Sequence, residues 1–279
     1  MATKTQNKYT KTQVEEMKSM TAAERRAYGK SLRKQVPSRS HGKWAPAADR
    51  PDPIELLQQE DTGRLQNLVP IKYGRMMVSP FAFLRGSAVV MASDLQDTPV
   101  TGLNVVLCGD AHLSNFGIFA TPEREVVFDV NDFDEAYPGP WEWDLKRLAA
   151  SAVVASRGNG FDDKTCRKLA AVVSESYRTA MQRFAAKTIL DDWYYHVDAA
   201  SVVELFKKYA GKNAKQAGKT VKKARSRTTA RTLEKMTHMV NGKRQIINSP
   251  PLVVRIADLL TDEQKKVARE QVDVTDAWR

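Results

Sequence analysis

Two short stretches in the middle of the chain combine residues that suit phosphate chemistry. Asp110 lies directly after a short apolar run, in Gly-Asp-Ala-His, and Asn115 follows five residues later. Asp132 begins the second stretch, Asp-Phe-Asp-Glu-Ala. A carboxylate on a loop after a strand can accept the proton of an incoming hydroxyl group, and Asn and Asp side chains offer the oxygen ligands that Mg²⁺ prefers. A base and two metal ligands beside the transferred phosphate are the parts that a phosphotransferase needs.

Strands and turns are expected to carry these residues. Residues 105–108 (Val-Val-Leu-Cys) predict a buried strand that ends at the Gly-Asp turn. Residues 118–120 and 125–130 predict two more strands, joined by a turn at 121–124, and residues 138–140 (Pro-Gly-Pro) are expected to end this sheet. The candidate residues therefore lie where strands end.

Helices are expected on both sides of this region. The apolar spacing in residues 141–157 predicts a helix that has Leu145, Leu148, Ala149, Ala152 and Val153 on one face. Thr21, followed by an acid three residues later, predicts a capped helix that runs to about residue 35. Further helices are predicted at 54–68, 163–187, 199–210 and 262–271, and residues 213–240 also suit a helix. Residues 69–85 suit a helix or a strand, 36–53 suit an extended loop, and the aromatic cluster 193–195 is expected to be mostly packed.

The net charge of +11 is concentrated in one segment. Residues 206–245 contain thirteen Lys and Arg residues and a single acid, Glu234, so the rest of the chain is close to neutral. The stretch Lys207–Arg231 is a candidate for contact with the phosphate backbone of a nucleic acid, and the alternative is a solvated helix face. It has no interleaved aromatic residues, so base stacking is not expected.

Composition excludes several classes of protein. No apolar run reaches the roughly 18–20 residues that a membrane-spanning helix needs, and the N-terminus lacks the apolar core of a secretory signal. We therefore expect no membrane span and a cytoplasmic location. Two cysteines, Cys108 and Cys166, cannot form a disulfide framework. Four scattered histidines argue against a zinc site of the usual spacing.

The order of these motifs resembles a known catalytic core. Asp-x-His-x-x-Asn (110–115), Asp-Phe-Asp-x-Ala (132–136), Gly-Pro (139–140) and Asp-Leu (144–145) are similar to the core of aminoglycoside phosphotransferases and choline kinases, within the protein-kinase-like fold. The stretches SPFAFLRGSA (79–88), LCGDAHLSNFG (107–117) and FDVNDFDEAYPGPWEWDLKRLAAS (128–151) resemble more closely the bacterial family DUF2252. This second resemblance runs from about residue 25 to the C-terminus.

The resemblance implies a role for each residue of these motifs. Asp110 would be the catalytic base, Asn115 a metal ligand and Asp132 the principal metal ligand, the counterpart of the Asp in the kinase Asp-Phe-Gly motif. Mg²⁺ and ATP would be the cofactors, with the nucleotide-binding residues unknown. Asp144 would brace the catalytic loop, and His112 would be a hydrogen-bonded brace rather than a base.

Some assignments stay open on the residues alone. Asp129 competes with Asp132 as the metal ligand, and the Asp-Phe-Asp-x-Ala match favours Asp132. Asp134 either assists the metal or faces solvent. Arg85 either clamps a phosphate or pairs with a buried acid such as Asp134. Weaker candidates for a phosphate clamp are Lys72 and Arg75.

One part of a kinase is not found in the sequence. No G-x-G-x-x-G stretch is present to cover the phosphates, and Cys108 stands where kinases often have His. In DUF2252, the resemblance implies a Gly-rich stretch and a Lys beyond the point where this chain ends. We therefore expect residues 1–279 to be the front part of a longer protein, to bind nucleotide weakly or undetectably, and to transfer negligible phosphate alone.

Together these observations predict an α+β protein. The expected domains are a helical and extended N-terminal extension, residues 1–60, and an incomplete kinase-like domain, residues 61–279. The latter is expected to be mainly helical with short β-hairpins, and its nucleotide-binding lobe to be missing or incomplete. The expected function is Mg²⁺-dependent phosphate transfer to a small hydroxyl-bearing substrate. The alternatives are a non-catalytic kinase-like domain and a nucleic-acid-binding protein that acts through residues 207–231.

Overall fold

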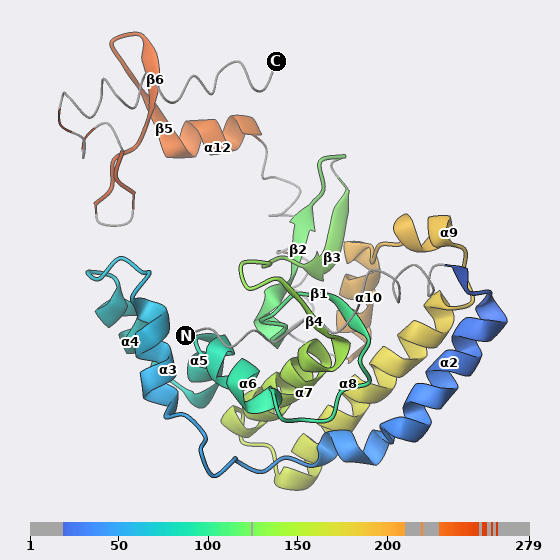
Figure 1. The fold of residues 1–279 in the computed structure, drawn as a ribbon. Helices are drawn as coiled ribbons and strands as arrows, with labels where there is room; N and C mark the ends of the chain where they lie inside the picture. Colours follow the sequence, from blue (N-terminus) through green and yellow to red (C-terminus); the bar gives the residue numbers. More distant parts are fainter. Residues whose placement is uncertain are drawn as a thin grey trace. The chain divides into compact units, whose positions relative to one another are not determined.

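The computed structural model describes residues 19–123, 125–209, 219, 229–250, 253–255, 258 and 261, and Figure 1 shows the fold. The chain divides into two compact units, of which the first comprises Met1–Gly117 and Phe128–Val197 and the second comprises Ile118–Val127 and Asp198–Arg279. In the described residues helices predominate, and the strands form two-stranded sheets. This mixture agrees with the predicted α+β class.

The predicted N-terminal helix is confirmed. Helix α2 (Ala22–Gln35) begins after Thr21, whose side chain accepts the N–H of Glu24 while the Glu24 carboxylate accepts the N–H of Thr21. This reciprocal pair satisfies backbone donors that the first turn of a helix leaves free, so it fixes where the helix starts. Residues 36–52 are irregular apart from the short helix η1 (Ser38–Gly42), as the Pro-rich sequence predicts for 36–53, and Pro53 already belongs to the next helix.

Four short helices follow: α3 (Pro53–Asp61), α4 (Val69–Met76), α5 (Pro80–Arg85) and α6 (Ala88–Leu95). The first three have Pro in their first turn, where the missing N–H is not needed. Residues 69–85 are thus helical, in two pieces. The helix expected over 54–68 ends earlier, at Asp61, because a turn begins at Thr62-Gly63. Leu57, Met76 and Val90 form a buried cluster that joins α3, α4 and α6.

The strand predicted at 105–108 is present, but its surroundings differ from the prediction. Strand β1 (Asn104–Leu107) pairs antiparallel with β4 (Tyr137–Pro140), with Val106 opposite Pro138. The expectation that Pro-Gly-Pro ends the sheet is therefore wrong, because a strand with one neighbour can direct a Pro nitrogen to its unpaired edge. The expected burial of β1 is also wrong, since only Leu107 is buried. A two-stranded ribbon cannot enclose both of its faces.

The two strands predicted after the Gly-Asp turn are confirmed as a hairpin. A single helical turn, η2 (Leu113–Asn115), leads into β2 (Phe116–Ala120), which pairs with β3 (Val126–Val130). At the base of the hairpin, the N–H of Asn131 donates to the carbonyl oxygen of Asn115 at 3.0 Å. The hairpin therefore returns the chain so that the second polar stretch lies beside the first.

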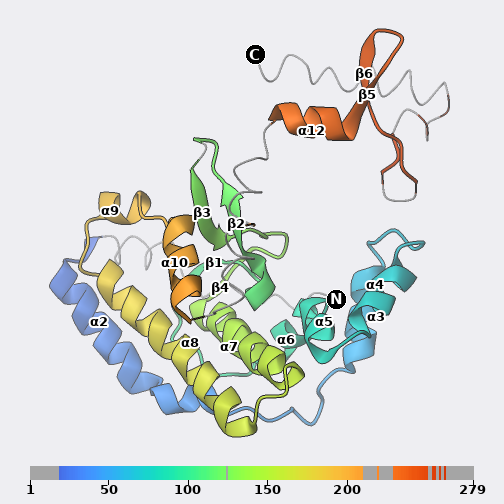
Figure 2. The same ribbon diagram turned by 180° about the vertical axis from the view of Figure 1, so that it is seen from behind.

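Two long helices complete the first unit. Helix α7 (Trp141–Gly158) packs beside α8 (Asp163–Phe184), as Figures 1 and 2 show, and the rings of Trp141 and Tyr177 stack with their centres 5.6 Å apart. Both helices were predicted, and on the predicted apolar face of α7 Ala152 is buried while the other four residues are half-buried. The buried residues of α7 are Glu142, Arg147, Ser151, Ala152 and Ser156. Four of these five side chains are polar, and two of them, Arg147 and Ser151, contact the irregular turn that follows β1.

Helix α9 (Ile189–Trp193) carries exposed aromatic residues. Trp193 is 80% exposed and Tyr194 is 75% exposed, so the expectation that this cluster is mostly packed is wrong for both. A helix of five residues is too short to present a continuous apolar face to a neighbour. Tyr195 does pack, because its ring meets Phe184 edge-on with centres 4.9 Å apart.

The second unit contains the tip of the β2–β3 hairpin and the predicted helix α10 (Ala199–Tyr209), with Val126 and Ala199 buried together. Helix α12 (Thr229–Met236) then leads to the hairpin of β5 (Thr237–Val240) and β6 (Lys243–Ile246). The hairpin turns at Asn241-Gly242, both with positive φ. The helix considered for 213–240 is therefore wrong at 237–240, because Asn-Gly favours a tight hairpin turn.

Two sequence predictions fall mainly outside the described residues. The helix predicted at 262–271 is among them, and so is most of the basic stretch Lys207–Arg231 with its candidate contact to phosphate backbones. Within the part of the chain that the structure describes, no helix combines the length and apolar character needed to cross a bilayer.

Candidate active site

The turn after β1 is packed against the loop that follows β3. Gly109 has φ of +84°, and a Cβ atom at this position would lie 1.9 Å from the carbonyl oxygen of Glu135. Only glycine permits backbone approach this close, and the left-handed conformation also favours glycine. The contact holds the segment that carries Asp110 against the segment that carries Asp132.

Cys108 joins the same two segments through its side chain. Its thiol donates a hydrogen bond to the carbonyl oxygen of Asp132, with 3.3 Å between sulfur and oxygen. The pKa of the thiol is raised by burial first, and also by the negative charges of Asp144, Asp110 and Asp132. Three carboxylates therefore lie within electrostatic reach of one sulfur atom.

Asp144, in the first turn of α7, holds the backbone of the turn. Its Oδ2 accepts the N–H of Cys108 at 2.7 Å, and its Oδ1 accepts the N–H of Gly109 at 3.1 Å. Burial raises the pKa of this carboxyl group, and the two backbone donors oppose that rise. Two N–H groups that would otherwise have no partner in this irregular turn are satisfied by one side chain.

Asp110, the candidate base, is bound by an arginine that the sequence analysis did not single out. Arg147 donates from Nε to Asp110 Oδ1 at 2.7 Å, and its Nη2 lies 2.5 Å from the same oxygen. The side chain of Arg147 is 4% exposed and that of Asp110 is 14% exposed. The pair is therefore largely shielded from water, with Asp110 slightly open to it.

His112 faces the other oxygen of the same carboxylate. Its Nδ1 accepts the N–H of Ser114 at 3.1 Å, so in the neutral ring the proton is on Nε2. Nε2 lies 3.4 Å from Asp110 Oδ2. Burial lowers the pKa of His112, although the charge of Asp110 acts in the opposite direction. Both ring nitrogens are thus engaged with the turn itself, which suits a brace better than a base.

A polar stripe on α7 organises the whole turn. Ser151, which is fully buried, accepts the N–H of Leu113 at 3.1 Å. Asp144, Arg147 and Ser151 are spaced by three and four residues, so they lie along one face of the helix. Sequence reasoning found Asp144 by its resemblance and missed the other two residues. The signal that marks them is polar residues at i, i+3 and i+7 within an otherwise apolar helix.

Comparison with known proteins assigns the family. The family model described as "Uncharacterized protein conserved in bacteria (DUF2252)" matches residues 64–276, a range that includes every residue of the candidate site. The chain belongs to the DUF2252 family. No curated protein and no solved structure matches the chain. Membership confirms the resemblance to DUF2252, and the kinase-like activity remains a prediction.

Arg85, a candidate phosphate clamp, is exposed in this DUF2252 protein. It is the last residue of α5, and its positive charge is felt by His112, where it contributes to the lowered pKa. Within the described residues Arg85 forms no ion pair, and the considered pairing with Asp134 is not present. The N–H of Asp134 instead donates to Asp132 Oδ1 at 3.3 Å.

Lys72, a weaker candidate for a phosphate clamp, is engaged elsewhere in the DUF2252 chain. Its Nζ lies 2.8 Å from Asp61 Oδ1 and 3.3 Å from Glu60 Oε2. Tyr73 donates its hydroxyl hydrogen to Asp61 Oδ2 at 2.6 Å. This bond to the carboxylate is the main reason why the pKa of Tyr73 is raised to about 12. These contacts tie α3 to α4 and occupy the Lys72 ammonium group.

The oxygen atoms of Asn115 and Asp132 suit Mg²⁺ as ligands. Asn115 donates from Nδ2 to the carbonyl oxygen of Asp110 at 2.7 Å, which leaves its Oδ1 as an oxygen ligand. Asp132 is exposed and adds a carboxylate. Among the described residues no three His, Cys, Asp or Glu side chains form a metal cluster. Mg²⁺ often takes only one or two protein ligands beside phosphate oxygens and water, so an Asn and an Asp fit its chemistry.

Asp129, the competing ligand, is also exposed. Its Oδ1 accepts the N–H of the next residue, Val130, at 2.7 Å. Asp129 belongs to strand β3, whereas Asp132 belongs to the loop that Gly109 and Cys108 contact. The loop that carries Asp132 therefore contacts the Asp110 turn directly, and none of these contacts involves Asp129.

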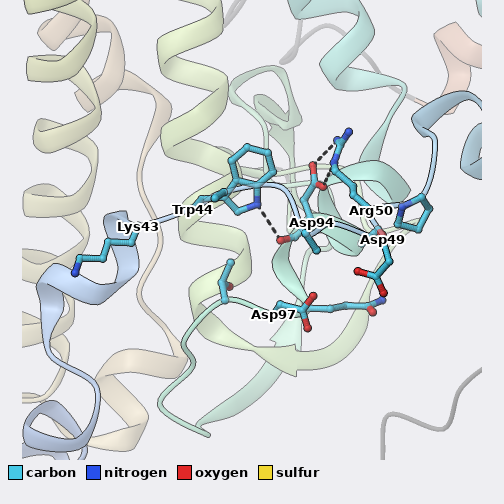
Figure 3. A pocket seen from close by; sticks show the side chains of 12 residues that line it. Lys43, Trp44, Asp49, Arg50, Asp94 and Asp97 are labelled. Atoms are coloured by element: carbon cyan, nitrogen blue, oxygen red, sulfur yellow. Dashed lines mark hydrogen bonds and ion pairs between the residues drawn. The ribbon is translucent and has the colours of Figure 1, made fainter.

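A hollow of about 270 Å³ opens beside Trp44 (Figure 3). Arg50 donates to both carboxylate oxygens of Asp94, at 2.5 and 2.9 Å, and the Trp44 indole N–H donates to the Asp94 carbonyl oxygen at 3.2 Å. Lys43 extends away from the other labelled side chains in Figure 3. None of the residues that line this hollow is a candidate site residue, so it is not part of the phosphate chemistry considered above.

Proposed function

We propose that this DUF2252 protein is a Mg²⁺-dependent, kinase-like phosphotransferase that acts on the hydroxyl group of a small molecule, with ATP as the donor. The observation that carries the proposal is the packing of the Cys108–Asn115 turn against the loop 131–136. This packing gathers a carboxylate, an amide side chain and a second carboxylate. Those groups are the ones that a phosphoryl-transfer site requires around the reacting phosphate.

Each group has a distinct task in this proposal. Asp110 accepts the proton of the substrate hydroxyl group through Oδ2, because Oδ1 is already bound by Arg147. Asn115 and Asp132 would hold Mg²⁺, which when bound neutralises charge on the phosphate oxygens. Arg85, as an exposed guanidinium group without an ion pair in the described residues, would bind a phosphate oxygen.

The nucleotide has few anchors in this sequence. No Gly-rich G-x-G-x-x-G stretch is present, and a kinase gains most of its rate from positioning and charge neutralisation around the phosphates. We therefore propose that these 279 residues bind ATP weakly or undetectably, and that their phosphate transfer is negligible except on the scale of a single turnover. Assays must use high protein concentrations and a radiolabelled phosphate to detect a single turnover.

A non-catalytic kinase-like domain is the second candidate. One observation favours it: Asp110 is held in a largely buried ion pair, so one of its two oxygens is not available to a substrate. Such a domain would keep the metal site and lose phosphate transfer. Metal binding and transfer therefore have to be measured separately.

Mn²⁺ tests the metal site, because it takes oxygen ligands as Mg²⁺ does and broadens NMR signals of nearby nuclei. Substoichiometric Mn²⁺ should broaden the backbone signals of Asn115 and Asp132 in the ¹⁵N-labelled chain. Asp132→Ala should abolish the effect, and the matched control Asp129→Ala should not. If the broadening is lost only in Asp129→Ala, Asp129 and not Asp132 is the metal ligand. If Mn²⁺ broadens neither signal in the wild-type chain, the proposed metal site is wrong.

Phosphate transfer is tested with γ-labelled ATP and a panel of small alcohols and amino alcohols under single-turnover conditions. Asp110→Asn should slow the transfer by about 10²- to 10⁴-fold, the usual contribution of a general base. Mn²⁺ binding without any transfer by the wild-type chain would favour the non-catalytic domain.

A further inference from the structure

A single buried guanidinium group connects three parts of the candidate active site. Arg147 contacts Asp110 Oδ1 through Nε and Nη2, and Nη2 also donates to the carbonyl oxygen of Leu84 at 2.5 Å. Its Nη1 meets the sulfur of Met91 at 3.6 Å. All three nitrogens therefore have a partner in a side chain that is 4% exposed.

These contacts restrict the Asp110 carboxylate to one orientation. Oδ1 receives two donors from Arg147, and Oδ2 faces His112 Nε2 at 3.4 Å. Rotation of the carboxylate would break the contacts with Arg147 and leave a buried positive charge unpaired, which is unfavourable. Oδ2, which faces His112, is thus the oxygen that has no contact with Arg147.

The same guanidinium group also fixes the end of α5. Leu84, whose carbonyl oxygen it binds, is the residue before Arg85. The distance between the candidate base and the backbone of the candidate phosphate clamp is therefore set through one side chain. A flexible link would leave the two groups free to move independently.

We infer that Arg147 is a positioning residue that orients Asp110 and holds its position relative to Arg85. The inference rests on the proposed function for its chemical meaning, but the contacts that carry it do not depend on that function. Lysine cannot replace Arg147, because a single ammonium group has no planar fork to contact a carboxylate oxygen, a carbonyl oxygen and a sulfur in fixed directions. Arg147→Lys thus removes the positioning and keeps the charge.

The first measurement detects the contact in the full chain, independent of any reaction. The Arg147 Nε–H signal, assigned by its loss in Arg147→Lys, should exchange with solvent roughly tenfold more slowly than that of Arg157, because it is buried and hydrogen-bonded. Arg157 is the matched control on the same helix, paired with Asp163 at 3.0 Å but well exposed. Asp110→Asn should move the Arg147 signal, and Asp163→Asn should not. If the position of the Arg147 Nε–H signal does not change in Asp110→Asn, the inference is overturned.

The second measurement detects the consequence for chemistry. In single-turnover transfer from labelled ATP, Arg147→Lys should lower the rate by about 100-fold, since a small misplacement of a catalytic group has effects of this size. The dissociation constant of ATP should change less than about twofold, because the Arg147 side chain is 4% exposed and each of its nitrogens already has a protein partner. Arg157→Lys should change neither quantity, and thermal unfolding should establish that both variants are folded.

The outcomes separate the inference from the proposed function. A wild-type rate in folded Arg147→Lys would overturn the inference while the proposed function stands. If the wild-type chain transfers no phosphate to any acceptor, the proposed function fails, and the Nε–H measurement alone decides whether Arg147 orients Asp110. If Arg147→Lys does not fold, the Arg147 Nε–H signal is assigned instead by through-bond NMR experiments on the isotope-labelled wild-type chain, and its response to Asp110→Asn decides the inference.

Discussion

A methyl group at position 109 would test the contact that gathers the candidate site. In Gly109→Ala, the new Cβ atom would lie 1.9 Å from the carbonyl oxygen of Glu135, which is a backbone atom and cannot rotate away. One of the two segments must therefore shift. The substitution should both destabilise the first unit and separate the Asp110 turn from the Asp132 loop.

The expected magnitude has two parts. A residue with a Cβ atom in the left-handed region costs about 1–2 kcal/mol relative to Gly, and Gly109 has φ of +84°. Overpacking against a fixed neighbour adds about 1–3 kcal/mol. Gly160 is a matched control in the same unit, because it has φ of +80° and a methyl group there would have no atom within 4 Å. Gly160→Ala should show only the first part.

Urea unfolding followed by tryptophan fluorescence measures both free energies, and equal denaturant slopes would show that the variants unfold the same structure. We expect Gly109→Ala to lose about 1–3 kcal/mol more than Gly160→Ala. It should also lose Mn²⁺ broadening at Asn115 and Asp132, which the control should keep. Equal destabilisation by both substitutions would refute the backbone contact, and retained broadening would show that the contact does not assemble the metal site.

Three further predictions concern stability. Tyr73→Phe removes a hydrogen bond to the Asp61 carboxylate and should lower the free energy of unfolding in urea by about 1–3 kcal/mol. Hydrogen bonds from Lys72 and Tyr73 lower the pKa of Asp61, so this loss of stability should shrink as the pH falls below about 4. A loss that does not depend on pH would contradict this prediction. Burial raises the pKa of Asp144, so the folded protein favours the protonated carboxyl group and loses stability as the pH rises from about 4. Asp144→Asn removes this titration and should have a flatter curve of unfolding free energy against pH. Parallel curves for the variant and the wild type would refute this prediction. Leu57→Ala should cost about 2–5 kcal/mol because Leu57 is fully buried, whereas the exposed control Leu65→Ala should stay within about 0.5 kcal/mol.

Local signals explain why much of the fold could be predicted. Thr21 and Glu24 satisfy each other's backbone donors within one turn, so the start of α2 depends on no distant residue. The strands of the β2–β3 hairpin likewise follow from two apolar runs with a polar turn between them. The positions of the candidate residues after the strands could be predicted in the same way, since polar residues that directly follow an apolar run can be recognised in the sequence.

The features that sequence reasoning missed depend on distant partners. Pro138 ends strands in most contexts, and it is tolerated in β4 only because β1 pairs with one side of that strand. Trp193 and Tyr194 have a composition typical of a core, yet α9 offers them no neighbour that covers them. In each case the outcome depends on which other segment packs beside the element, and the sequence of the element alone does not specify that neighbour.

The buried polar face of α7 follows from what this helix covers. A helix that packs against another helix meets apolar side chains, but one that packs against an irregular turn meets N–H groups and a carboxylate, and each of these needs a partner. Asp144, Arg147 and Ser151 meet successive parts of the turn, from Cys108 to Leu113, so the order of the stripe along the helix follows the order of the chain in the turn. An analysis of apolar spacing detects the rows on either side of this stripe and overlooks the stripe itself. Polar residues at i, i+3 and i+7 between apolar rows therefore indicate a helix that supports a loop, and in this chain the supported loop is the one with the candidate base.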